Sequence, residues 1–184
     1  MNTKDILAQT LKNLMNKTPV DKITINILTG EANVARNTFY YHFDDIKSIL
    51  EWIYAREIVV QLAVYQRQSN WIDGFKTLLG YIYENRKFCL NTFRSTNRSF
   101  LEHFLYRLAF DMVSGVVMDL EPDCDTNLRD EISNFYGRAL TSQVIQWLVT
   151  DMKESECEFV ERMERMLGGT IEAVVKRNYQ SLDK

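Results

Sequence analysis

The stretch ITINILTGEANVARNTFYYHF, residues 23–43, predicts two short helices joined by a tight turn. Thr24 is a suitable N-cap for the first of them, because its hydroxyl can accept a hydrogen bond from a backbone N–H two or three residues further on. Ile23, just before it, can pack against Leu28 as a hydrophobic staple. We therefore expect a two-turn helix over residues 25–32.

Asn33 predicts the tight turn after this helix, because asparagine tolerates the left-handed backbone conformation that commonly ends a helix. The next helix is expected to begin at Ala35 or Arg36 and to continue to about His42. Before both of them, apolar residues at three- and four-residue steps predict a helix over residues 3–16. Three helices with a tight turn between the last two are the layout of a helix-turn-helix.

The helix after the turn has one apolar face. Phe39 and Phe43 are four residues apart, so they lie on the same side of the helix. We expect this side to be buried in a small core. The other residues expected in that core are Ile27, Leu28 and Val34.

The opposite face is expected to point outward, and it carries Arg36, Asn37, Tyr40 and Tyr41. Arginine and asparagine can each form two hydrogen bonds with a base edge, and tyrosine can donate to a phosphate or contact a thymine methyl group. These residue types favour double-stranded DNA as a partner. The alternative is that the aromatic side chains pack this helix against the rest of the protein.

The composition is that of a folded globular protein, with 46% hydrophobic and 26% charged residues. Residues 1–50 hold six Lys+Arg against five Asp+Glu, which leaves 16 against 20 for residues 51–184. This distribution suits a small module that contacts an anion and a larger part that binds partners. Because the basic surplus is small, DNA binding would depend on geometry and dimerisation.

Membrane insertion is not expected. The longest uncharged run has twelve residues, Ala139–Thr150, whereas a membrane-spanning helix needs about 20 apolar residues. The N-terminus does not contain the apolar stretch of a secretory signal. We expect a cytoplasmic protein.

The sequence contains no catalytic or metal-binding motif. Its three cysteines, Cys89, Cys124 and Cys157, are widely spaced, which predicts neither a disulfide framework nor a C-x-x-C metal site. It has no nucleophile elbow and no glycine loop that could hold a phosphate. We expect neither an enzyme nor a bound cofactor or metal.

Residues 23–53, ITINILTGEANVARNTFYYHFDDIKSILEWI, resemble the helix-turn-helix signature of the TetR family of bacterial one-component regulators. Members usually carry a Thr-capped helix, an Ala-Gly-Val-type turn and a Thr-Phe-Tyr-x-His-Phe block. That block is present here at the expected distance from the capping threonine. The resemblance implies that seven residues contact DNA bases or phosphates: Thr24, Arg36, Asn37, Thr38, Tyr40, Tyr41 and His42.

Four positions depart from the family pattern. Asn33 replaces the usual glycine, and Ala35 replaces the serine or threonine that often caps the second helix. Ile27 stands where an acidic residue would complete a capping box. Ile46 replaces a frequent lysine, which leaves Lys47 beside it as the candidate for a phosphate contact.

The rest of the chain also predicts helices, and no segment alternates polar and apolar residues as a strand would. We expect an all-α fold, with a three-helix DNA-binding domain over residues 1–50 and a larger helical regulatory and dimerisation domain over residues 51–184. The further helices are expected over residues 45–67, 71–85, 98–119, 127–151 and 156–178.

The last two predicted helices carry wide apolar stripes. In the TetR family two C-terminal helices of each subunit pair into a four-helix dimer interface, and the resemblance implies the same homodimer here. The alternative is that both stripes are buried within one subunit. The residues expected at the interface are Phe135, Leu140, Val144, Trp147, Leu148, Met163, Leu167, Ile171 and Val174.

Three further segments bear on regulation. FYGRALTSQVIQWLVTDM (135–152) and YIYENRKF (81–88) are similar to a C-terminal domain of Firmicutes members of the family, among them regulators of dihydroxyacetone kinase. Residues 86–100 hold four cations and no acid, which suits either the anion-binding wall of an effector pocket or, preferably, a solvated loop.

These features predict a homodimeric transcription regulator that binds a near-palindromic operator. A small-molecule effector or a partner protein held by the C-terminal domain would alter its affinity for DNA, through differential binding to two conformations. The alternative is a protein-interaction module whose helical body binds a partner protein rather than a small molecule.

Overall fold

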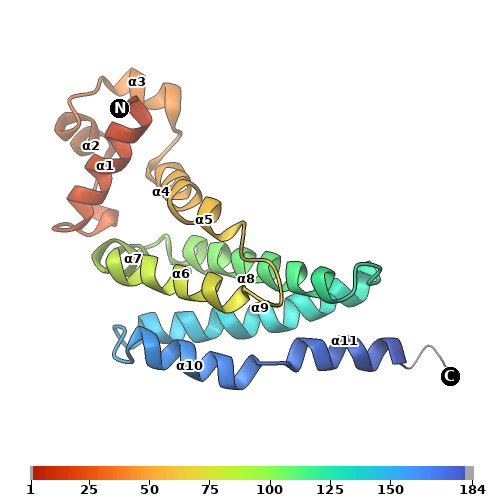
Figure 1. Ribbon diagram of the computed structural model, residues 1–184. Coiled ribbons are helices and arrows are strands. Elements are labelled where there is room, and N and C mark those ends of the chain that lie inside the picture. Colours follow the sequence, from red (N-terminus) through yellow and green to blue (C-terminus); the bar gives the residue numbers. More distant parts are fainter. Residues whose placement is uncertain (1, 181–184) are drawn as a thin grey trace. The chain divides into compact units, whose positions relative to one another are not determined.

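The computed structural model describes residues 2–180, with the side chains of residues 179 and 180 excepted, and every regular element in that range is a helix (Figure 1). The predicted all-α fold is therefore confirmed. The chain forms two compact units. The first comprises the residues up to Val60 together with Glu84–Leu101, and the second comprises Gln61–Tyr83 and the residues from Glu102 onward.

The first unit contains the three helices of the expected helix-turn-helix, each within a residue or two of its predicted bounds (Figure 1). Its buried centre includes Leu7, Leu11, Leu28 and Phe39, all with no exposed surface. Its elements are α1 (Thr3–Met15), the 3-10 turn η1 (Val20–Lys22), α2 (Ile25–Glu31), α3 (Arg36–His42), α4 (Ile46–Tyr54), the π-helical turn η2 (Ala55–Val59) and α7 (Arg86–Phe93).

The second unit is a bundle of longer helices. Phe159 is fully buried at its centre, with its ring centroid 5.6 Å from that of Phe75 and 5.4 Å from that of Trp147. Arg162 closes the edge of this cluster through a two-pronged ion pair with Glu154, which lowers the pKa of that carboxyl group. Its elements are α5 (Val60–Leu62), α6 (Trp71–Glu84), α8 (Arg98–Leu120), α9 (Thr126–Val149), α10 (Glu156–Leu167) and α11 (Thr170–Gln180).

Two predicted helices are shorter than expected. The helix predicted over residues 45–67 passes through the π-helical turn and ends at Leu62. The helix predicted over residues 156–178 is interrupted after Leu167, where Gly169 has a φ of 72°, a left-handed conformation that a continuous helix does not contain.

The loop preferred for residues 86–100 is wrong over its first half, which forms α7. Phe88, Cys89 and Phe93 are at most 6% exposed, so this helix contributes a buried face to the first unit. The exposed cations Arg86 and Lys87 begin the helix and Arg94 follows it, so the sequence pattern indicated a charged segment and not a buried face.

Asn91 of α7 ties this helix to the connection that follows α1. Its side-chain amide donates to the carbonyl oxygens of Met15 and Thr18, both at 2.8 Å. Its side-chain oxygen accepts from the backbone N–H of Val20, also at 2.8 Å. One side chain therefore satisfies three backbone groups of this turn.

We expect Asn91→Ala to lower the free energy of unfolding by about 2–4 kcal/mol, because three backbone groups lose their partner. Urea denaturation followed by circular dichroism measures this value. Asn26→Ala, an exposed change on α2, serves as the control and should alter stability by about 0.5 kcal/mol at most. Equal effects of the two substitutions would contradict the clamping role.

Candidate nucleic-acid interface

Thr24 caps α2 as predicted. Its hydroxyl oxygen accepts a hydrogen bond from the backbone N–H of Ile27 at 3.2 Å. Ile23 and Leu28 are both buried, in agreement with the expected staple. The start of α2 is therefore held by a local hydrogen bond beside two buried apolar side chains.

Asn33 makes the turn between α2 and α3. Its φ of 51° is left-handed, which confirms the conformation expected from the sequence. The next residue, Val34, donates its N–H to the carbonyl oxygen of Thr29 at 3.0 Å, so the end of α2 is closed by a backbone bond. At Ala35 the N-cap of α3 has no side-chain hydrogen bond, as its methyl side chain requires.

The inner face of α3 is formed by Phe39 and Phe43, as predicted. Phe39 is fully buried and Phe43 is 6% exposed. Their ring centroids are 6.3 Å apart, and Phe43 makes an edge contact with Trp52 of α4 at 6.1 Å. Ile27 does not join this core. It is 45% exposed, because it lies on the side of α2 that faces away from Leu28.

The outer face of α3 carries the groups expected to contact DNA. Tyr41 is 83% exposed and Tyr40 is 47% exposed. Arg36 and Asn37 are also exposed. The guanidinium of Arg36 donates to the Tyr40 hydroxyl at 3.2 Å and lies 5.6 Å from the centre of its ring, so the two side chains are already arranged on one surface.

The remaining candidate residues surround this surface. Thr24 is exposed, whereas Thr38 and His42 are half-buried, with the imidazole ring 4.9 Å from the ring of Tyr41. Lys47 lies on α4 and pairs with Glu51 at 3.4 Å; both side chains are about half exposed, so this pair is weak and the lysine can exchange it for another anion.

Acidic groups are absent from α3 and begin at Asp44. The next carboxylate, Asp45, is occupied as the N-cap of α4, where it accepts from the N–H of Ser48 at 2.7 Å. The outer face of α3 therefore offers a cation, an amide and two phenols, which can donate hydrogen bonds to an anionic surface.

The residues expected at a dimer interface fall into two groups. Phe135 is 71% exposed, and Leu167, Ile171 and Val174 are half-buried. The others need a correction, because they pack inside the second unit of a single chain and present no surface to a partner. The residues in this buried group are Leu140, Val144, Trp147, Leu148 and Met163, none more than 4% exposed.

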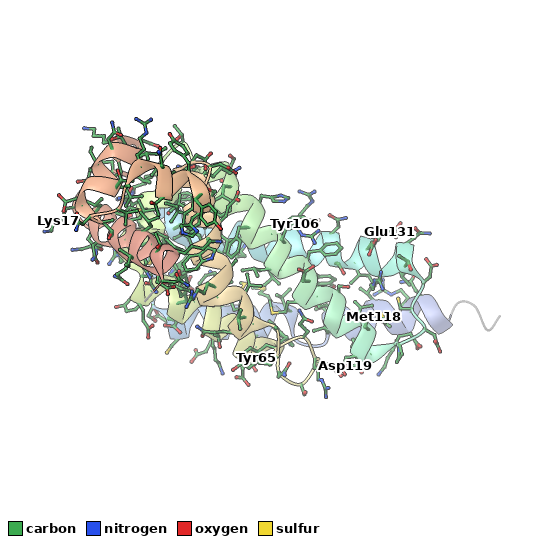
Figure 2. The ribbon with its side chains drawn as sticks, turned by 90° about the horizontal axis from the view of Figure 1, so that it is seen from above. Lys17, Tyr65, Tyr106, Met118, Asp119 and Glu131 are labelled. Atoms are coloured by element: carbon green, nitrogen blue, oxygen red, sulfur yellow. The ribbon has the colours of Figure 1, made fainter. Side chains whose placement is uncertain are left out.

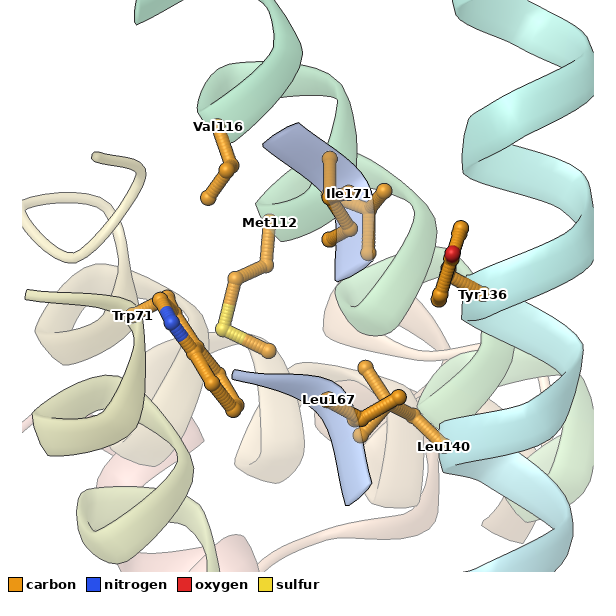
Figure 3. A pocket seen from close by; sticks show the side chains of 8 residues that line it. Trp71, Met112, Val116, Tyr136, Leu140, Leu167 and Ile171 are labelled. Atoms are coloured by element: carbon orange, nitrogen blue, oxygen red, sulfur yellow. The ribbon is translucent and has the colours of Figure 1, made fainter. Parts of the chain in front are cut away.

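One cavity in the second unit lies where α8, α9 and α11 meet (Figure 3). Its lining is apolar and includes Trp71, Met112, Leu140 and Ile171. Its volume is about 10 Å³, close to the minimum that holds a single water molecule. In this conformation the cavity is too small for an organic effector.

The described residues hold no arrangement that suggests catalysis. Among residues 2–180, no three His, Cys, Asp or Glu side chains are placed to bind a metal ion. Burial raises the pKa of the Cys89 thiol to about 12, so this group stays protonated and unreactive at neutral pH. No helix in the same range has the length and apolar character needed to cross a bilayer.

Comparison with known proteins identifies the family of this chain. A TetR-type family model, described as "Transcriptional regulator C-terminal region", matches residues 69–169. This chain belongs to the TetR family of transcriptional regulators.

The chain is similar to one curated protein and to one solved structure in particular. The chain is similar to the HTH-type dhaKLM operon transcriptional activator DhaS of Lactococcus lactis subsp. lactis (strain IL1403), with 26% identity over 136 residues. The aligned residues make up 74% of this chain and 72% of that protein. The solved structure of a dihydroxyacetone kinase operon activator DhaS has the same fold, with a TM-score of 0.68 and 20% identity over 95% of this chain and 96% of the other.

Two substitutions at helix N-caps should have opposite effects on stability. Thr24→Ala removes the cap of α2 and is expected to lower the free energy of unfolding by about 1 kcal/mol. Ala35→Ser introduces a hydroxyl at the uncapped, extended start of α3 and should raise it by about 0.5 kcal/mol. Thermal denaturation of both variants checks these signs; a stabilising Thr24→Ala would contradict the capping role.

Proposed function

We propose that this TetR-family protein binds double-stranded DNA through residues 24–43 and regulates transcription as a homodimer on a near-palindromic operator. The observation that carries the proposal is the division of α3 into two faces. Phe39 and Phe43 anchor the helix from behind, while Arg36 and Tyr41 remain exposed on its other side.

The residue types suggest separate roles on DNA. Arg36 and Asn37 are suited to base edges, because each can form paired hydrogen bonds in the major groove. Tyr40 and Tyr41 are suited to phosphates or to thymine methyl groups. The residues at the margin, Thr24, Thr38, His42 and Lys47, would contact the phosphate backbone and set the register of the helix.

Dimerisation follows from the size of the reading helix. α3 has seven residues and is therefore only about 10 Å long, which spans about three base pairs. The net charge of residues 1–50 is too small to supply strong non-specific binding. Two copies placed about one DNA turn apart would double the contacts and require a near-palindromic site.

Fewer of the predicted interface residues are exposed than the sequence suggested, so the surface available for a second subunit is smaller. On α9, the exposed apolar side chains are Phe135 and Val149, which are 71% and 53% exposed. Met166 at the end of α10 is 65% exposed. These residues, with the half-buried Leu167, Ile171 and Val174 nearby in the sequence, form the interface we propose.

The signal that controls the regulator is proposed to be a partner protein rather than a small molecule in the second unit. The small volume of the cavity described above, about 10 Å³, supports this reading, because an organic effector needs a pocket of about 300 Å³ or more. The related Lactococcus protein is named as an operon activator. We propose that the present protein also regulates transcription of an operon and that it acts in the cytoplasm.

Fluorescence anisotropy with DNA from upstream of the protein's own gene tests the DNA-binding role. Arg36→Ala and Tyr41→Ala should each weaken binding about tenfold or more, since each removes a base or phosphate contact of about 1–3 kcal/mol. Their melting temperatures should stay near that of the unmodified protein because both side chains are exposed.

Tyr83→Ala is the matched control, since Tyr83 is an exposed tyrosine on α6 and outside the proposed interface. Its DNA affinity should equal that of the unmodified protein. If Arg36→Ala and Tyr41→Ala both bind DNA as tightly as the unmodified protein, α3 is not the helix that recognises DNA.

Sedimentation velocity tests the homodimer. The protein should sediment as a dimer at micromolar concentration, and Phe135→Glu should shift it toward monomer, because a charge in an apolar interface is costly. Val64→Glu, at an exposed position in the loop after α5, should leave the dimer intact. A monomeric unmodified protein would refute dimerisation, and a dimeric Phe135→Glu variant would place the interface elsewhere.

A further inference from the structure

An open groove lies in the first unit between the residues that follow α1 and the outer face of α7. Its volume is about 470 Å³, within the range of about 300–1,000 Å³ that is typical of small-molecule sites. It differs in this respect from the closed cavity of the second unit, which has about 10 Å³.

The rim of the groove is mainly cationic. Lys17 comes from the turn after α1, and Lys87 and Arg94 come from the two ends of α7. Among residues 2–180, neither lysine forms an ion pair. Figure 2 shows Lys17 at the outer edge of the first unit.

One carboxylate also lines the groove. Asp21 accepts hydrogen bonds from the N–H of Thr96 at 3.2 Å and from its hydroxyl at 2.7 Å. It is therefore held against α7's C-terminal turn and not directed to either lysine. Three cations against one anion leave the groove positively charged, although the whole chain has a net charge of −3.

Hydrogen bonds hold the frame of the groove, and part of its lining is apolar. Asn91 lies in its lining and is fully used in holding the turn, through its bonds to Met15, Thr18 and Val20. Leu90 supplies an apolar side chain from the same helix. A preorganised frame lowers the entropy that a ligand loses on binding.

The groove and α3 adjoin opposite ends of α1. Near its first turn, Lys4 lies over the ring of Phe43 at 5.5 Å, whereas Met15 at its last turn lines the groove. A helix of thirteen residues is about 20 Å long. A ligand in the groove would therefore leave the outer face of α3 free.

We infer that this groove is a binding site for a small organic anion, one that carries a phosphate or carboxylate group on a compact apolar body. Lys17 and Lys87 would bind the anionic group, and Leu90 would contact the apolar part. Charged hydrogen bonds of this kind are stronger than neutral ones, so the charge of the ligand is the main determinant of its affinity. The inference does not depend on DNA binding.

Isothermal titration calorimetry with the full chain tests this site, with phenyl phosphate, benzoate and inorganic phosphate as probes and neutral benzamide as the comparison. Phenyl phosphate or benzoate should bind at least tenfold more tightly than benzamide. Lys17→Gln combined with Lys87→Gln should weaken anion binding about fivefold or more. Binding should also raise the melting temperature, and the double variant should lose this rise.

Lys22→Gln is the matched control, because Lys22 is an exposed lysine of the same unit that does not line the groove. It should retain the affinity of the unmodified protein. Tighter binding of inorganic phosphate than of phenyl phosphate would retain the anion site but overturn its apolar part. No binding by any anion at millimolar concentration, or equal losses in Lys22→Gln and the double variant, would overturn the inference.

Discussion

Burial of the Phe39 ring is the constraint on which the helix-turn-helix depends. α3 has only seven residues, and a helix of that length is unstable alone, so its conformation must come from packing. Full burial of a phenylalanine contributes up to about 3 kcal/mol. Because Phe39 and Phe43 both face inward, the side chains of Arg36, Asn37, Tyr40 and Tyr41 lie on the other side of the helix and face outward. The exposed chemistry of α3 is therefore a consequence of its core.

Signals that act over a few residues predicted the helix-turn-helix well. Thr24 and Asn33 have the conformations expected of them, because capping and left-handed turns depend on nearby backbone atoms. The predictions failed where they concerned burial: the exposure of Ile27, the buried face of α7 and the burial of Trp147 within one chain. Periodicity shows which face of a helix is apolar, but it does not show whether a distant segment covers that face. Asn91, for example, bonds with Met15, 76 positions earlier, and no local pattern indicates that pairing.

One cavity in the second unit and one groove in the first differ in size. The second is packed around Phe159, and its apolar cavity has room for about one water molecule. The first, although it contains the helix-turn-helix, has an open cationic groove beside α7. The groove that we propose for an anion lies at the end of α1 remote from Phe43.

The first unit is discontinuous in the sequence, since the chain leaves it at Val60 and returns at Glu84. On the ribosome, α1 to α4 are therefore synthesised well before α7, and synthesis proceeds at about 5–20 residues per second. Until α7 emerges, the turn after α1 lacks Asn91, and the apolar residues that α7 covers remain open to solvent. A nascent chain of about 60 residues thus contains all of α1 to α4 without the helix that finishes the fold of the first unit, and this unit is complete only after the chain has grown to Leu101.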